Sequence, residues 1–271
     1  MLIGGKNFDT THEAYVMGIL NLTPDSFSDG GRYQAVDQAL FRIEEMIQEG
    51  ASIIDIGGES TRPGYQMISP EEEIERTSPL IRAASERFDI PLSIDTYKAP
   101  VARAALEAGA AMVNDIWGFR YDPLMAETVS SFGASCCLMH NRASAVYDDL
   151  IGEIQQDLAL SVKTAVQAGI PENQIMIDPG IGFGKTYEMN LQVLREMAVF
   201  CRGPYPVLLA CSRKSVIGNT LHLPVEERLE GTLALTAAGV LAGCAFVRVH
   251  DVQANVRAIK MALAIRRNND E

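Results

Sequence analysis

The chain has 271 residues, of which 47% are hydrophobic and 21% are charged, and this composition indicates a globular protein with a sizeable core. Disordered, collagen-like and small disulfide-stabilised proteins are excluded on the same ground. The net charge of −12 disfavours nonspecific nucleic-acid binding, although a locally basic pocket can still hold an anionic small molecule. Neither a transmembrane run nor a signal-peptide pattern is found, so we expect a cytoplasmic protein with no nucleic-acid or membrane partner.

The cysteines and histidines form no recognisable disulfide or zinc pattern. The five cysteines are odd in number and lack C-x-x-C spacing, so we expect reduced and mostly buried thiols. The four histidines are not paired at i, i+4, which excludes the helical zinc motif of metalloproteases.

Eight short apolar runs alternate with longer segments of helical period. Such alternation predicts βαβ units, and the nearly continuous hydrophobicity of the runs predicts strands buried on both faces of a parallel sheet. The runs cover residues 15–20, 52–56, 91–94, 111–114, 135–139, 174–177, 206–210 and 245–249.

The segments between these runs carry helix signals. An apolar stripe over residues 36–47 ends before Gly50, and Ser69 followed by Pro70 predicts a capped helix that continues to Ile81. Further helices are expected at residues 151–165, 225–243 and 252–267. Since no linker divides the chain, we expect residues 1–271 to form one domain, a single (β/α)8 TIM barrel of the α/β class with a short N-terminal extension. The main alternative is a doubly wound open sheet, but its common phosphate-binding fingerprints are absent.

Polar side chains follow nearly every predicted strand. One such Asp or Asn is usually a helix N-cap, and one His is usually a structural residue. A whole set at the carboxyl ends of the strands is better explained by an active site, because these ends form the catalytic face of a TIM barrel. The set comprises Asn21, Asp55, Asp95, Asn114, His140, Asp178, residues 212–215, Arg248 and His250.

The chemistry of this set divides by charge. Asp95, Asn114 and Asp178 suit a planar heterocycle that presents several N–H donors and a carbonyl group. On the cationic side, carbonyl and diphosphate oxygens suit Lys214, Arg248 and His250. The residues alone therefore indicate a heteroaromatic substrate together with an anion.

A neutral asparagine follows the first strand, and as a metal ligand it would need further ligands from the substrate. Asn21 could serve Mg²⁺ if phosphate oxygens and water completed the octahedral shell. Two long loops, at residues 23–33 and 57–69, are expected to close over a reacting centre and exclude water.

At these same residues the sequence resembles the dihydropteroate synthase family of the folate pathway. The motifs include GILNLTPDSFSDGG at 18–31, DIGGESTRPG at 55–64, DPGIGFGK at 178–185, SRKS at 212–215 and RVHD at 248–251. Shorter matches at residues 94–96 and 114–116 complete the series in family order. Each motif is weakly specific alone, but together they are highly specific.

The resemblance implies a transferase that joins 6-hydroxymethyl-7,8-dihydropterin diphosphate to p-aminobenzoate by a dissociative, Mg²⁺-assisted reaction. It implies that the pterin diphosphate is held by Thr61, Asp95, Asn114, Met139, Asp178, Phe183, Lys214, Arg248 and His250. The implied p-aminobenzoate site consists of Phe27, Thr61, Arg62, Pro63, Phe183, Lys214 and Ser215. The implied catalytic residues are Asp95, Lys214, Arg248, His250 and Asp29, with Asn21 on the metal. Family members are commonly homodimers, and the last two predicted helices are candidate interface elements. The alternative, which we favour for most positions, is that their apolar stripes face the barrel.

Two features depart from the family pattern. The loop after His140 is shorter than the family's usual M-H-x-x-G-x-P segment, which leaves the roles of His140 and Arg142 open and can alter p-aminobenzoate or sulfonamide contacts. Ala210 stands where glycine commonly precedes the SRKS motif, so we expect its methyl group to crowd the pterin side slightly.

Two other functions remain as alternatives. A methyltransferase that acts on methyltetrahydrofolate would share the barrel and the pterin contacts, but it would not need the segments 212–215 and 248–250. A noncatalytic pterin-binding paralogue would be expected to lose loop or anion-site residues, whereas Asn21, Lys214 and His250 are all present.

Overall fold

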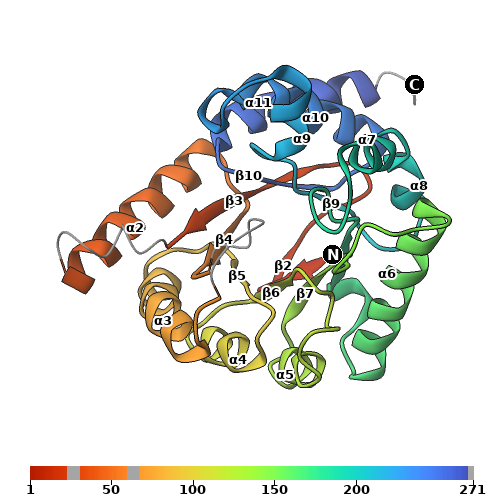
Figure 1. The fold of residues 1–271 in the computed structure, drawn as a ribbon. Coiled ribbons are helices and arrows are strands. Elements are labelled where there is room, and N and C mark those ends of the chain that lie inside the picture. The colour runs from red at the N-terminus through yellow and green to blue at the C-terminus, as the bar shows by residue number, and fades with distance from the viewer. Residues whose placement is uncertain (23–30, 60–66, 268–271) are drawn as a thin grey trace.

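Eight parallel strands form a barrel in the computed structural model, which describes residues 1–22, 31–59 and 67–267 (Figure 1). The strand order is β8-β7-β6-β5-β4-β3-β10-β9, and a parallel bridge between Ile177 and Val207 joins the two ends. The strands are β3 (Tyr15–Asn21), β4 (Ile53–Gly57), β5 (Leu92–Asp95), β6 (Met112–Asp115), β7 (Ser135–Met139), β8 (Ile175–Asp178), β9 (Leu208–Leu209) and β10 (Phe246–Val249). The predicted TIM barrel is therefore confirmed, and each predicted strand is present.

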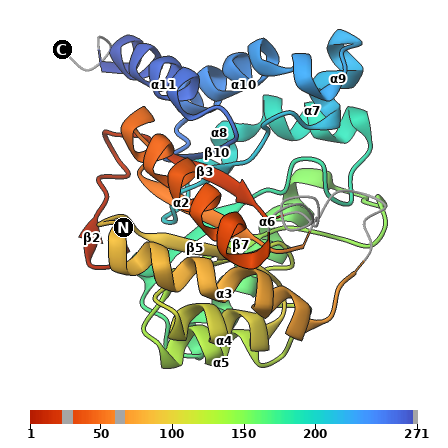
Figure 2. The ribbon, with the colours of Figure 1, turned by 90° about the vertical axis from the view of Figure 1, so that its left-hand side faces the viewer.

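The helices surround the barrel, as Figures 1 and 2 show. They are α2 (Gly31–Glu49), α3 (Pro70–Arg87), α4 (Ala99–Glu107), α5 (Met125–Ser131), α6 (Leu150–Gln167), α7 (Tyr187–Arg195), α8 (Met197–Cys201), α9 (Ser215–Leu221), α10 (Leu229–Ala242) and α11 (Val252–Arg267). One helix start differs from the prediction, because residues 225–227 form a separate 3-10 turn before α10 begins. The short helices α4, α5, α7, α8 and α9 were not predicted.

Side-chain caps explain where two of the longer helices begin. Ser69 Oγ accepts a hydrogen bond from the backbone N–H of Glu72 at the start of α3, as the sequence predicts. The carboxylate of Glu72 pairs with Arg76 one turn later, so it supports the helix through an i, i+4 ion pair. Asp149 caps α6 in the same way, accepting from Gly152 N at 3.2 Å.

The described residues bury three separate apolar clusters. The largest lies between the outer faces of the strands and the helices, and a smaller layer fills the amino-terminal part of the barrel interior with side chains such as Met17 and Phe246. The third is a small cluster of Tyr97, Ile116 and Met139 near the carboxyl ends of the strands. The N-terminal extension forms a hairpin of β1 (Leu2–Ile3) and β2 (Lys6–Asn7). Its Ile3 and the following Phe8 pack into the smaller layer and close the amino-terminal end of the barrel, away from the tip of β3 (Figure 2). The opposite, carboxyl-terminal end of the barrel, which we call the mouth, carries polar side chains.

The described cysteines are all free thiols, and Cys201 is half-buried whereas the other four are buried. Among the described residues, no three His, Cys, Asp or Glu side chains gather as a metal site would require. Nor does the described part of the chain contain a helix that is long and apolar enough to cross a bilayer.

We predict that Phe8→Ala destabilises the fold without altering the mouth of the barrel. Phe8 is 7% exposed and packs edge-on against Tyr15 at a ring distance of 4.9 Å, so its removal leaves a cavity that should cost about 3–5 kcal/mol. Denaturant unfolding measures this loss. Phe41→Ala is the control, because Phe41 is 62% exposed on α2 and its removal should change the stability by less than about 0.5 kcal/mol. Equal losses of stability in Phe8→Ala and Phe41→Ala would contradict the role of Phe8 in closing the amino-terminal end of the barrel.

Candidate active site

The strand register places four residues of the mouth in one row. Asn21 of β3 lies opposite Gly57 of β4, Gly57 lies opposite Asp95 of β5, and Asp95 lies opposite Asn114 of β6. A Cβ atom at Gly57 would come within 3.3 Å of the side-chain oxygen of Asn21 and within 3.6 Å of the Asp95 Cβ. The glycine therefore leaves space between the amide on one side and the carboxylate on the other.

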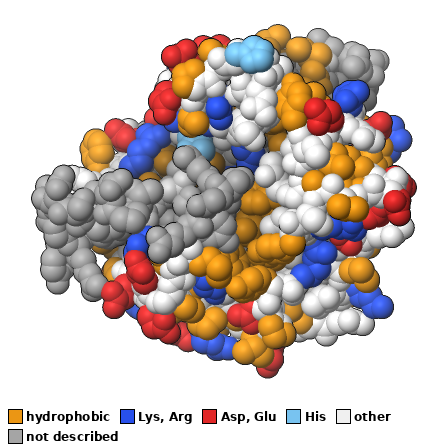
Figure 3. Space-filling model, in the orientation of Figure 1, with side chains coloured by type: hydrophobic (Ala, Val, Ile, Leu, Met, Phe, Trp, Pro, Cys, Tyr) orange, Lys and Arg blue, Asp and Glu red, His pale blue; other side chains and the backbone are white. Residues whose placement is uncertain are grey.

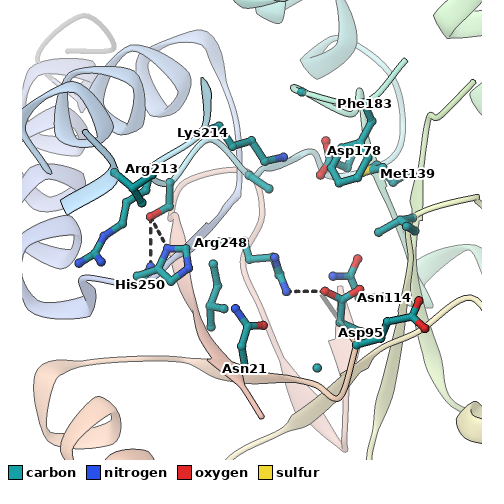
Figure 4. A pocket seen from close by; sticks show the side chains of 18 of the residues that line it. Asn21, Asp95, Asn114, Met139, Asp178, Phe183, Arg213, Lys214, Arg248 and His250 are labelled. Carbon is teal, nitrogen blue, oxygen red and sulfur yellow. Dashed lines mark hydrogen bonds and ion pairs between the residues drawn. The ribbon is translucent and has the colours of Figure 1, made fainter. Parts of the chain in front are cut away.

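An arginine inside the barrel joins two carboxylates of this region. Arg248 Nε donates to Asp55 Oδ2 at 2.5 Å. Arg248 Nη2 donates to Asp95 Oδ2 at 2.6 Å, as the dashed line in Figure 4 marks. Asn114 Nδ2 also donates to Asp55 Oδ2, at 3.1 Å. Asp55 thus fixes both the arginine and the amide.

Each carboxylate retains one buried oxygen that is unsatisfied. Asp55 Oδ1 and Asp95 Oδ1 make no hydrogen bond within the described structure, although both atoms are buried. Burial raises the pKa of Asp95 to about 7, even though the Arg248 guanidinium opposes this shift. An orphaned buried acceptor is costly, so a ligand that brings N–H donors to Asp95 would gain by satisfying it.

The opposite wall of the mouth carries a second carboxylate and a lysine. Asp178, at the end of β8, accepts from Gly180 N at 2.7 Å, and burial raises its pKa. Lys214 Nζ donates to Ile181 O at 2.5 Å and lies 4.6 Å from the ring centre of Phe183. Burial lowers the pKa of Lys214, while the charge of Asp178 acts in the opposite direction. The ring, the ammonium group and the carboxylate face the same opening (Figure 4).

The connection after β8 requires glycine and a half-buried lysine. Gly180 has a φ of 73°, and a Cβ atom there would lie 1.9 Å from the backbone oxygen of His140. Lys185 Nζ donates to Gly180 O at 2.9 Å, to Phe183 O at 3.1 Å and to His140 Nδ1 at 3.0 Å. Burial lowers the pKa of His140 to about 3, so the neutral imidazole can accept this bond. These contacts hold the turn that presents Phe183.

A histidine and several cations line the side near β9 and β10. Ser212 Oγ lies 2.9 Å from His250 Nδ1 and accepts from the His250 backbone N–H at 3.2 Å (Figure 4). Next to this pair, Arg213 forms two hydrogen bonds with the carboxylate of Asp251, at 2.7 and 3.1 Å. The acidic side chains on the face seen in Figure 3 lie mainly toward its periphery, whereas this part of the mouth is cationic.

A buried lysine ties together the ends of the second long loop. Lys98 Nζ donates to Glu59 Oε2, to Glu73 Oε2 and to Ile68 O, each at 2.8 Å. The backbone N–H of Ile68 also donates to Glu59 Oε2 at 2.8 Å. Burial raises the pKa of Glu73, with the lysine opposing this shift. Glu59 and Ile68, which flank the predicted substrate loop, are thereby held to one cation.

Side chains at and just beyond the carboxyl ends of the strands line a cavity of about 380 Å³. The predicted site residues that it brings together are Asn21, Asp95, Asn114, Met139, Asp178, Phe183, Lys214, Ser215, Arg248 and His250. The predicted residues Phe27, Asp29, Thr61, Arg62 and Pro63 lie outside the described residues.

Other residues at the cavity differ from the expectation. His140 and Arg142 are not among the described residues that line it, whereas Arg76 and Arg228 are lining residues that were not predicted. Arg213, which belongs to the predicted set at residues 212–215 but was given no role of its own, also lines the cavity. Ala210 lines the cavity as expected, and the crowding of a pterin by its methyl group stays a prediction.

The comparisons with known proteins agree with this architecture. Residues 17–250 match a family model described as "Pterin binding enzyme". The dihydropteroate synthase of Clostridium beijerinckii is 54% identical over 262 residues, covering 96% of this chain and 97% of the relative. A solved dihydropteroate synthase from Clostridium difficile, in the presence of pteroic acid, has a TM-score of 0.93 at 46% identity and covers 96% of this chain and 100% of that one. The enzyme of Xanthomonas albilineans with 4-aminobenzoic acid has a TM-score of 0.88 at 40% identity, covering 94% and 93%.

The barrel and its mouth are thus those of a pterin-binding transferase. The chain belongs to the dihydropteroate synthase family.

We predict that Asp55→Asn destabilises the protein by about 3 kcal/mol, because it leaves the buried Arg248 with one carboxylate fewer. Urea unfolding measures the loss. Asp37→Asn, at an exposed position of α2, is the matched control and should be close to neutral. If Asp55→Asn were as mild as the control, Asp55 would not be the anchor of the arginine.

Proposed function

We propose that this protein condenses 6-hydroxymethyl-7,8-dihydropterin diphosphate with p-aminobenzoate to give 7,8-dihydropteroate and diphosphate. The observation that carries the proposal is the unsatisfied, buried Oδ1 of Asp95 beside Asn114 and opposite Asp178 in one cavity. Relatives solved with pteroic acid and with 4-aminobenzoic acid support the same two halves of the substrate.

The pterin half fits the acceptor side of the mouth. A dihydropterin presents adjacent N–H groups on its pyrimidine ring, and a carboxylate pairs with two such donors as it does with an arginine. Asp95 and Asp178 would accept from the ring, and Asn114 would supply either an acceptor or a donor. Lys214 would donate to ring acceptors, while Met139 and Phe183 would cover the faces of the ring.

The diphosphate fits the cationic side. Arg248 and His250 would bind its oxygens near β9 and β10, which are the seventh and eighth strands of the barrel, where phosphates commonly bind in this fold. Asn21 is the protein ligand that we propose for Mg²⁺, because Asn21 lines the cavity, carries an amide oxygen, and Mg²⁺ usually retains water and substrate phosphate oxygens as its other ligands. When bound, the metal ion would neutralise part of the diphosphate charge.

The charge distribution of the site suits a dissociative reaction. The C–O bond between the pterin methylene and the diphosphate breaks with both electrons going to oxygen, which leaves positive charge delocalised into the ring. The Asp95 carboxylate would stabilise that cation from a buried position, and Arg248 and His250 would stabilise the departing anion. The amine nitrogen then forms the new bond to the methylene and loses a proton. Since the electrophile is already strong, no powerful general base is required.

The amine would enter from the solvent side of the pterin. Lys214, Phe183 and Ser215 would form the described part of its site. The assignments of Phe27, Thr61, Arg62 and Pro63 to p-aminobenzoate, of Thr61 also to the pterin diphosphate, and of Asp29 to closure of the site stay predictions.

We also propose a cytoplasmic homodimer. Leu241 of α10 is 45% exposed, and Met261 and Ile265 of α11 are 63% and 48% exposed. These side chains support the α10–α11 face as the interface, because exposed apolar clusters are typical of protein contacts.

The experiment is to supply both substrates with Mg²⁺ and to measure dihydropteroate and diphosphate together. Equal amounts of the two products are expected. Diphosphate without dihydropteroate would contradict the proposed amine site, and neither product from folded protein would favour the methyltransferase or the noncatalytic alternative.

We predict that Asp95→Asn and Lys214→Ala each lower turnover by a factor on the order of 10²–10³, because each removes one electrostatic contact with the reacting pterin. Both variants should remain folded by circular dichroism. Lys163→Ala is the control for loss of a lysine, since Lys163 is exposed on α6, and it should keep the normal rate. A near-normal rate for either site variant would contradict the role assigned to that residue.

A further inference from the structure

The turn before Lys214 contains a residue in an unfavourable backbone conformation. Lys214 N donates to Cys211 O at 3.1 Å, which closes a turn over residues 211–214, and Arg213 at its third position has a φ of 57°. This left-handed region favours glycine, and a residue with a Cβ atom persists there only when its surroundings hold it. The strain lies between two residues of the mouth, Ser212 and Lys214.

Contacts from two separate segments, the start of α10 and the residue after β10 and His250, hold Arg213. Its guanidinium bonds to both oxygens of Asp251, with Nη2–Oδ1 at 2.7 Å and Nε–Oδ2 at 3.1 Å. Its backbone N–H donates to Thr232 Oγ1 at 3.2 Å, and its carbonyl oxygen accepts from Arg228 Nη1 at 3.0 Å. The ion pair is two-pronged, a geometry that arginine makes and lysine cannot.

The ion pair between Arg213 and Asp251 connects the segment that carries Lys214 to the segment that carries His250. Arg213 directly precedes Lys214, and Asp251 directly follows His250. A second contact, between Ser212 Oγ and His250 Nδ1 at 2.9 Å, runs alongside it. The connection after β9 is therefore tied to the end of β10 at the strained residue and at the residue before it.

We propose that Arg213 is a positioning residue, which sets the placement of Lys214 relative to His250 through its ion pair with Asp251. This inference rests on the proposed function, because it assumes that Lys214 and His250 act on one pterin diphosphate. Arg213 lines the cavity, but its guanidinium is bonded to Asp251, and no substrate contact is assigned to it. Small displacements of binding groups weaken binding and turnover strongly, which explains why a strained conformation is retained here.

Four variants test this role. Arg213→Gly removes the ion pair, but glycine adopts the left-handed conformation readily. This variant therefore measures the effect of losing the ion pair while the backbone conformation of the turn is kept. Arg213→Gln and Asp251→Asn break the pair from either side, and Arg213→Lys keeps the charge without the two-pronged geometry. The matched control is Arg42→Gln on α2, because Arg42 is 33% exposed in an ion pair with Glu49 and Arg213 is 32% exposed.

The measurements are the Kd of the pterin diphosphate by calorimetry, kcat, and thermal unfolding. We expect Arg213→Gly, Arg213→Gln and Asp251→Asn to weaken binding and lower kcat by a factor on the order of 10 to 100, with Arg213→Lys intermediate and Arg42→Gln unchanged. The double variant Arg213→Gly with Asp251→Asn should be no worse than either single one, since both remove one interaction.

Three results would overturn the proposal. One is a folded Arg213→Gly variant with the Kd and kcat of the unaltered protein, and another is a double variant whose losses add. The third is unfolding of Arg213→Gly and Asp251→Asn alike, which would make the pair a determinant of folding instead of placement. Product formation by the unaltered protein tests the proposed function separately, so the two failures are distinguishable.

Discussion

The ion pairs of Arg248 inside the barrel determine how the mouth can bind a ligand. A buried guanidinium is tolerated only when anions compensate its charge, and here Asp55 and Asp95 do so at 2.5 and 2.6 Å. Each carboxylate uses only Oδ2 toward the arginine, and each leaves Oδ1 buried without a hydrogen bond. Two carboxylate oxygens near the floor of the cavity are thus left able to accept hydrogen bonds. In the proposed function, the N–H groups of the pterin donate to the one on Asp95.

The barrel makes this arrangement possible because apolar side chains fill one end of its interior, while polar side chains occupy the other end, where ligands bind. Met17 and Phe246 fill the amino-terminal part of the interior together with the N-terminal hairpin, so the strands are packed before they reach the mouth. One further step along the strands the inward positions become polar, as at Asp55 and Arg248. Residues that are 193 positions apart in the chain can meet there, because β4 and β10 both flank β3.

Sequence patterns predicted the parts of the structure that depend on residues close together in the chain. The eight strands were readable because both faces are buried, and the mouth residues followed from the rule that strand ends form the catalytic face. Short helices such as α5 and α8, with seven and five residues, were missed because one or two turns carry too little periodicity. The partners of Lys98 and Arg213 were also missed. A charge is visible in the sequence, but its partner depends on how distant segments pack, as with Arg213 and Asp251, which are 38 residues apart.

The most direct measurement of the central claim is the pH dependence of pterin binding in the unaltered protein and in Asp95→Asn. A pterin without the diphosphate is the appropriate probe, because its binding does not include phosphate titration. The pKa of Asp95 is raised to about 7, so the carboxyl is protonated on the acid side and cannot accept from both N–H groups of the ring. We predict that affinity rises with pH through about 7 in the unaltered protein, and that Asp95→Asn binds weakly with a flat profile. The same rise in Asp95→Asn, or no rise in the unaltered protein, would contradict the assignment of Asp95 as the buried carboxylate that holds the pterin.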